Sequence, residues 1–209
     1  MEDIAVELNQ KEDYSKDIAE KAVKNPQLIS ILLNMVYSDI TRVKFRSMKV
    51  LNIISGKNPE ILYPDVDFFI KLLDNSNKVI MWNAMDILAN LSAVDSQEKI
   101  EDIFEKFYGF LSDESMVTAG HVVDNSWKIA RAKPKYQKKI TDNLLELENI
   151  PRDQECRSIL LGKAVLSFDK YFDEIQDKED VISLVKRQLD SPRNATKVKA
   201  ERFLKKHSD

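Results

Sequence analysis

A helical pattern recurs about every 40 residues along this chain of 209 residues, and it constrains the fold more than any other feature. In "NSNKVIMWNAMDILANLSAV", residues 75–94, Ile80, Ala84, Leu88 and Leu91 fall on one face of an α-helix. The steps between successive copies of this frame are 37, 39, 41 and 36 residues. Spacing this regular indicates a structural repeat. The other copies begin at Val43, Ala119, Leu160 and Thr196.

A second apolar segment precedes each framed helix, and several of these segments begin with helix-entry chemistry. Pro26, Pro59 and Pro134 fit the first turn of a helix, where the missing N–H costs nothing. The phrase "KNPQLI" at 24–29 returns as "KNPEIL" at 57–62. We therefore predict one domain, 1–209, built from paired helices. Its expected parts are an N-terminal cap at 1–25 and repeats at 26–57, 58–94, 95–133, 134–171 and 172–209.

Helix pairs of this length resemble HEAT repeats, of the armadillo-like superhelix class. The copies "TRVKFRSMKVLNII", 41–54, and "ATKVKAERFL", 195–204, carry the resemblance best. The basic residue that follows the first framed position in that family is present as Lys44 and Lys197, but it is Met81, Gly120 and Leu161 in the other copies. The resemblance implies an all-α fold, a HEAT/armadillo-type α-α superhelix of about five helix pairs with an N-terminal capping helix.

Composition narrows the class of protein further. The chain is 43% hydrophobic and 32% charged, and only 4 glycines argue against a turn-rich sheet protein or a phosphate-cradling loop. Its sole cysteine, Cys156, cannot form an internal disulfide, which favours a reducing compartment. The acidic start resembles no signal peptide, and no apolar run approaches the roughly 20 residues of a membrane helix. We expect a cytoplasmic protein that does not contact the membrane.

A near-neutral net charge of −3 conceals a strong segregation of charge. The predicted second-helix segments, 40–57, 77–93, 116–134, 153–171 and 192–209, hold 18 Lys/Arg and 7 Asp/Glu, a net of +11. The remaining segments have a net of −14. In HEAT proteins the second helix of each pair tends to form the concave side, so the resemblance implies a basic concave surface.

Two interpretations of this segregation stay open. In one, acidic first helices and basic second helices only pair with each other, in exposed ion pairs worth under about 1 kcal/mol each. In the other, the basic surface binds a protein or peptide partner of acidic character, or alternatively nucleic acid. The second interpretation predicts a non-enzymatic scaffold whose contacts come from side chains on the second helices. The predicted partner-binding residues are Arg42, Arg46, Lys49, Trp82, Asn83, Asp86, Asn125, Lys128, Lys197 and Lys199.

Residues able to perform catalysis are sparse. Two histidines, His121 and His207, and one cysteine do not suit a conventional zinc site, and no common catalytic or phosphate-binding motif occurs. We expect His121 to face solvent or bond to a helix cap, and Cys156 to be a small buried apolar residue. We therefore predict no cofactor, no metal and no enzymatic activity.

One enzymatic alternative follows from a second resemblance. Trp82 and Asp86 stand at i and i+4, a spacing similar to that of the Trp and Asp on the wall of HEAT-like alkylpurine DNA glycosylases. The resemblance implies that Asp86 stabilises a developing sugar cation, that Trp82 lies against the damaged nucleotide, and that Trp127 is a second aromatic. The tryptophan–leucine–polar–arginine stretch of that family is absent one repeat later, where this chain has "MVTAGHVVD".

Overall fold

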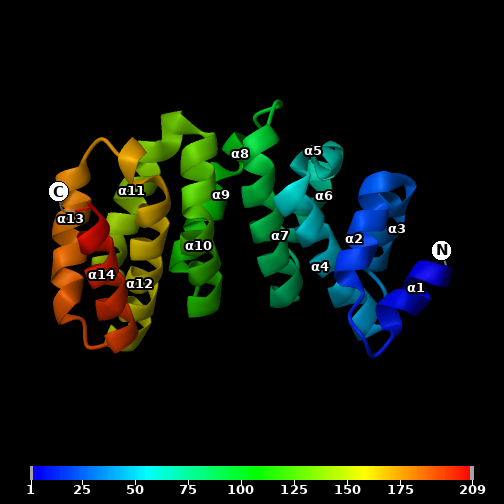
Figure 1. Cartoon of the computed structure of the whole chain (residues 1–209), viewed down its shortest axis with the longest axis horizontal. Helices are drawn as coiled ribbons and strands as arrows, with labels where there is room; N and C mark the ends of the chain where they lie inside the picture. The colour runs from blue at the N-terminus through cyan, green and yellow to red at the C-terminus, as the bar shows by residue number, and fades with distance from the viewer. Residues whose placement is uncertain (1, 208–209) are drawn as a thin grey trace. The chain divides into compact units, whose positions relative to one another are not determined.

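The fold was analysed in a computed structural model, which describes residues 2–207 and contains no strand in that range. The chain groups into two compact units, Met1–Ile103 and Phe104–Asp209, and each is described by itself (Figure 1). The prediction of one continuous domain stays a prediction. Within both units the paired-helix repeat is confirmed, because each long second helix follows a shorter and more broken first segment.

The N-terminal unit contains a cap of two helices, α1 (Glu2–Asn9) and α2 (Ser15–Lys24), where the sequence predicted one capping helix. The first repeat follows as α3 (Gln27–Met35) and α4 (Thr41–Lys57). In the second repeat, α5 (Pro59–Leu62), a 3-10 turn at Tyr63–Asp65 and α6 (Val66–Leu72) precede α7 (Lys78–Leu91). A 3-10 turn at Ser92–Val94 and the short α8 (Lys99–Asp102) complete the unit.

The C-terminal unit repeats this plan. Helix α9 (Phe104–Gly109) and a 3-10 turn precede α10 (Met116–Ala132); a 3-10 turn, α11 (Gln137–Leu145) and a further turn precede α12 (Gln154–Tyr171). Helix α13 (Lys178–Arg187) and a 3-10 turn precede the last helix, α14 (Asn194–His207). The second helices lie side by side, since α12 packs against both α10 and α14. In the N-terminal unit α4 packs in the same way against α2 and α7.

The second helices α7, α10 and α12 begin where a side chain satisfies otherwise unpaired N–H groups of the first turn. Asn77 accepts from the N–H groups of Val79 and Ile80 before α7, and Ser115 accepts from Thr118 before α10. Asp153 does the same for Cys156 before α12. These caps fix where each long helix starts, and thereby fix which face of it is turned to the core.

The positions of the recurring frame are buried in the core, with two exceptions. Ile80 is 4% exposed, and Ala84, Leu88 and Leu91 are fully buried, as the periodicity predicted. The other copies are buried too, with two exceptions, Trp127 and Leu204, which are half-buried. The remaining buried frame residues are Val43, Ser47, Leu51, Ile54, Ala119, Val123, Ala130, Leu160, Ala164, Phe168, Tyr171, Thr196 and Ala200.

Among residues 2–207, no helix is long and apolar enough to cross a membrane.

Candidate functional site

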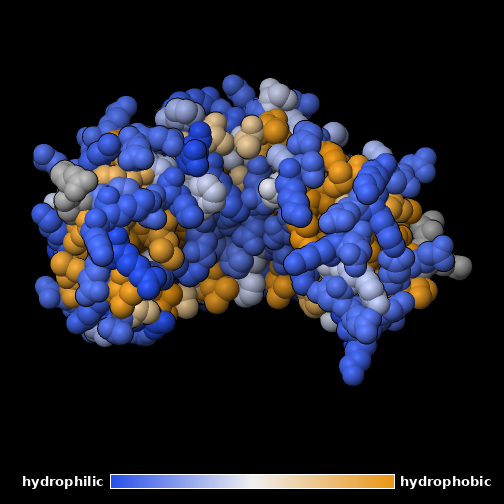
Figure 2. Space-filling view, viewed as in Figure 1, coloured by the Kyte–Doolittle hydropathy of each residue, from blue (hydrophilic) through white to orange (hydrophobic). Residues whose placement is uncertain are grey.

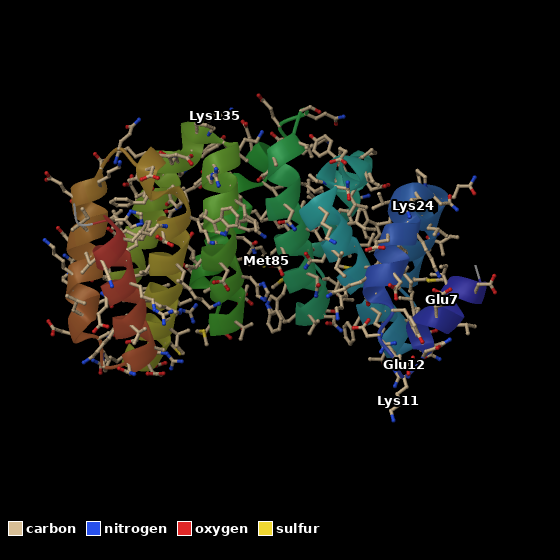
Figure 3. All side chains as sticks on the ribbon, viewed as in Figure 1. Glu7, Lys11, Glu12, Lys24, Met85 and Lys135 are labelled. Atoms are coloured by element: carbon tan, nitrogen blue, oxygen red, sulfur yellow. The ribbon has the colours of Figure 1, made fainter. Side chains whose placement is uncertain are left out.

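The predicted basic cluster on α4 is occupied by the chain's own N-terminal segment. The Arg46 guanidinium donates to the carbonyl oxygens of Leu8 at 3.0 Å, Gln10 at 2.6 Å, Lys11 at 3.2 Å and Glu12 at 2.8 Å. These carbonyls stand at the end of α1 and in the loop after it. Figure 3 shows Lys11 and Glu12 at the tip of this loop.

The neighbours of Arg46 bind the same segment. Arg42 donates to the carbonyl of Asn9 at 2.7 Å, and the Lys49 ammonium lies 2.5 Å from the Asp13 carboxylate. The hydrogen bond from Lys49 is the main cause that holds the pKa of Asp13 far below its usual range. The last carbonyls of a helix have no partner within the helix and carry its negative end, so cations suit them. Arg42, Arg46 and Lys49 therefore stabilise the cap.

Of the three predicted site residues on α7, Asn83 contacts α4. Trp82, Asn83 and Asp86 are all half-buried. The Asn83 amide donates to the Val79 carbonyl at 2.8 Å, and its oxygen lies 3.5 Å from the Asn52 amide nitrogen of α4. Trp82 and Asp86 share one helical face, as the spacing predicted.

A second amide contact crosses from α7 to α4. Asn90 donates to the Ser55 hydroxyl at 2.9 Å. With Asn52 and Asn83, it places three half-buried asparagines along the junction of two second helices. Sequence reasoning missed Asn52 and Asn90, although both lie next to framed positions and an amide there is a detectable signal. Such amides can donate to and accept from the backbone of an extended peptide.

The predicted residues of α10 are less accessible than expected. Asn125 is only 2% exposed and donates to the His121 carbonyl at 2.9 Å, so it lies beneath the surface, and the prediction that it projects was wrong. Lys128 is half-buried and donates to the Asn125 oxygen at 2.9 Å.

The two predicted lysines of α14, Lys197 and Lys199, are half-buried. Within residues 2–207, neither ammonium has a hydrogen-bond or ion-pair partner. Burial, followed by the nearby charge of Lys163, lowers the pKa of Lys199 below that of a free lysine. Lys197 and Lys199 thus differ from the basic cluster on α4, because no other group of the described residues binds them.

Cys156 and the histidines form no reactive group with each other. Cys156 is half-buried, so the prediction that it is buried was wrong; it stands in the exposed first turn of α12. Its hydrogen bond with Asp153 raises the pKa of the thiol, which disfavours the reactive thiolate. His121 is half-buried, and His207 contacts Asp169 at 2.7 Å. No group of three potential metal ligands from His, Cys, Asp and Glu comes together in the part of the chain that the structure describes.

No protein-family profile matches the sequence, and no curated sequence matches it significantly. Solved structures do match. A designed armadillo repeat protein in complex with the peptide (KR)4 superposes with a TM-score of 0.59 at 14% identity, over 97% of this chain and 97% of that one. A second designed armadillo repeat protein gives 0.54 at 16% identity, over 97% and 98%.

A third match is an engineered protein, with a TM-score of 0.59 at 17% identity, over 98% of this chain and 94% of that one. Identities this low carry information about fold alone. The likeness nevertheless extends along almost the whole chain, in agreement with the repeat inferred from the helical frame. The chain has an all-α fold of the armadillo-like helical-repeat type.

Proposed function

We propose that this chain is a non-enzymatic scaffold that binds an acidic segment of a protein or peptide partner on its second helices. The observation that carries the proposal is that two basic residues of α14 have no partner among residues 2–207. Lys197 and Lys199 lie half-buried on the second-helix layer of the C-terminal unit, without a partner among residues 2–207. Cations in this state attract an anionic ligand more strongly than paired ones do.

The fold favours a peptide as the ligand. A designed armadillo repeat protein with this fold was solved in complex with the peptide (KR)4, which is basic. Here the second-helix segments are basic, with a net of +11, so charge complementarity favours a ligand of opposite sign. Preformed helices lose little conformational freedom on binding, which favours recognition of an otherwise extended segment.

The location proposed for the protein is the reducing cytoplasm. Cys156 supports it, since the sole cysteine of the sequence cannot form an internal disulfide.

A direct binding experiment tests the proposal. Fluorescence anisotropy would compare a capped glutamate-rich peptide, a lysine-rich peptide of equal length and a short DNA duplex. We expect the glutamate-rich peptide to bind, and the charge reversal Lys197→Glu/Lys199→Glu to weaken it by about tenfold or more. The matched control is Lys186→Glu on α13, an exposed lysine on a first helix. Variants of Arg42 and Arg46 are unsuitable, because both side chains hold α1.

Other outcomes would redirect the proposal. Binding only to DNA, with affinity falling steeply as salt rises, would assign the layer to nucleic acid. Release of modified bases from alkylated DNA, abolished by Asp86→Asn, would instead support the glycosylase alternative built on Trp82 and Asp86. Either result, with no affinity for the acidic peptide, would overturn the scaffold.

A further inference from the structure

A mainly apolar pocket lies between α2, the second helix of the cap, and α4 in the N-terminal unit. Its volume is about 190 Å³, and its apolar walls come from Ala19 and Val23 of α2 and from Ile53 and Ile54 of α4. The two helices pack against each other within one compact unit. An apolar cavity of roughly 150 Å³ can hold a benzene-sized group. The pocket therefore has room for one apolar side chain.

Two of the wall residues, Val23 and Ile53, are only half-buried. In the repeat frame, Ile53 stands ten residues after Val43. The equivalent residue of α10, ten residues after Ala119, is Ile129, which is 2% exposed. The fold can therefore cover an isoleucine at this position, whereas the N-terminal unit leaves one partly in contact with solvent. An apolar side chain of a ligand would remove this surface from water, which is favourable.

Two lysines flank the pocket, Lys24 in the last turn of α2 and Lys57 in the last turn of α4. Figure 3 shows Lys24 at the end of α2. Both side chains are exposed, and neither ammonium has a hydrogen-bond or ion-pair partner among residues 2–207. A cation in the last turn suits the negative end of a helix, but that role leaves the ammonium group free to bind an anion. With one carboxylate from Glu20 against two ammonium groups, the lining keeps an excess of positive charge.

The combination of an apolar wall and free cations selects the ligand. On the visible face of the N-terminal unit, apolar side chains emerge between hydrophilic ones in the region of α2 and α4 (Figure 2). A purely acidic segment would leave the apolar wall in contact with water, and a purely apolar segment would leave both lysines without a counter-ion. A segment with an apolar residue between acidic ones matches both features.

We propose that this pocket is an anchor site, which takes one apolar side chain of the partner's acidic segment while carboxylates on either side of that residue pair with Lys24 and Lys57. The inference rests on the proposed function and adds to it a contact region on the N-terminal unit and a local sequence pattern in the ligand. Exposed ion pairs contribute little by themselves, so burial of the apolar side chain supplies most of the affinity at this site.

The test compares two capped 12-residue peptides of glutamate and serine, one with a single central leucine and the other with serine in its place. Isothermal titration measures their binding to the full chain. We expect the leucine to increase the affinity about tenfold. Val23→Asp places a charge on the pocket wall and should abolish this advantage. The matched control is Val6→Asp, at a 61% exposed valine of α1, which should retain it.

The contribution of the lysines is tested without altering the wall of the pocket. The double variant Lys24→Gln/Lys57→Gln changes two exposed side chains, so the fold should be preserved. We expect it to bind the leucine peptide about threefold more weakly than the unaltered chain does. Lys16→Gln, at an exposed lysine of the same α2 outside the pocket lining, is the matched control and should bind like the unaltered chain.

Methyl NMR locates the bound leucine directly. The methyl resonances of Val23 and Ile53 should shift when the leucine peptide is added, and those of Val6 should not. A leucine advantage that persists in Val23→Asp, or an unshifted Ile53, would overturn the anchor site. Equal affinity for the two peptides would also overturn it, but the acidic-partner scaffold would stand if Lys197→Glu/Lys199→Glu still weakened their binding. Absence of binding by both peptides would overturn the anchor site and the scaffold together.

Discussion

The basic residues on α4 and those on α14 have similar sequence surroundings but different surroundings in the fold. On α4, Arg46 binds four backbone carbonyls and Lys49 binds Asp13, and all of these groups are supplied by the end of α1 and the loop that leads from it to α2. On α14, Lys197 and Lys199 face no such segment and have no partner among the residues that the structure describes. The two helices carry similar basic residues. They differ in whether another segment of the chain binds those residues.

This contrast separates the two interpretations of the segregated charge by region of the molecule. The bases of α4 are used inside the N-terminal unit, as the pairing interpretation holds, although their partners lie in the preceding cap and are mostly carbonyl oxygens. Lys197 and Lys199 of α14 have no such partner among residues 2–207, which is the condition that the binding interpretation requires. The net charge summed over all the second helices therefore overestimates the positive charge that a partner could contact.

The largest expected effect in this comparison comes from Arg46→Ala. Because the side chain is only 16% exposed and donates to four carbonyls, its removal leaves several polar groups without a partner. We expect a loss of about 3 kcal/mol in the free energy of unfolding, together with faster amide hydrogen exchange in α1. Urea unfolding and hydrogen exchange measure the two effects.

The control for Arg46→Ala is Arg202→Ala on α14, an exposed base, which should change stability by less than about 0.5 kcal/mol. Arg46→Lys should recover only part of the loss, since one ammonium cannot reach the set of carbonyls that a guanidinium fork reaches. Equal stabilities for the two alanine variants would show that α4 and α14 hold their bases in equivalent ways.

The next effect distinguishes two glycines on second helices of the C-terminal unit, Gly162 on α12 and Gly120 on α10. A Cβ on Gly162 would stand 2.7 Å from Thr196 Oγ1, a buried atom held by its hydrogen bond to the Ser158 carbonyl. Gly162→Ala should therefore cost about 2 kcal/mol in urea unfolding. At Gly120 the nearest atoms belong to the flexible end of Lys163, and alanine gains helix propensity, so Gly120→Ala should be near neutral. The reverse order would contradict the assigned packing.

Arg152 offers a smaller version of the Arg46 effect, in the C-terminal unit. Its guanidinium donates to the carbonyls of Leu111 at 3.2 Å, Glu114 at 3.2 Å and also Asp113, while its buried Nε has no partner among residues 2–207. An unsatisfied buried donor offsets part of the gain. We therefore expect Arg152→Ala to cost about 1 to 2 kcal/mol, less than Arg46→Ala, in the same unfolding experiment.

The helical frame predicted the fold because burial of one helix face leaves a direct record in the sequence. The same periodicity failed at Asn125, which is buried although it lies outside the frame, and at Trp127, which is only half-buried although it lies within the frame. The site was less predictable for a related reason. The partners of Arg46 are backbone carbonyls, which any sequence presents, so no side-chain pattern reveals them. Lys199 was among the predicted residues, but its lack of a counter-ion became visible only in the structure, because it depends on which side chains of the neighbouring helices lie within reach.

The smallest effect concerns the pH dependence of the cap. The hydrogen bond from Lys49 lowers the pKa of Asp13 in the folded chain, so Asp13 stabilises the fold above its unfolded pKa of about 3.9 and loses this contribution as the pH falls below that value. Because its side chain is 40% exposed, the contribution should stay below about 1 kcal/mol. Asp13→Asn should therefore be slightly less stable than the unaltered chain at pH 7, with the two converging as the pH falls below about 4. Urea unfolding across this range measures the difference, with Asp39→Asn at an exposed turn as the control. A difference that persisted unchanged to pH 2 would mean that the charge of Asp13 contributes nothing, and that the contacts of Arg42 and Arg46 with backbone carbonyls hold the N-terminal segment on α4.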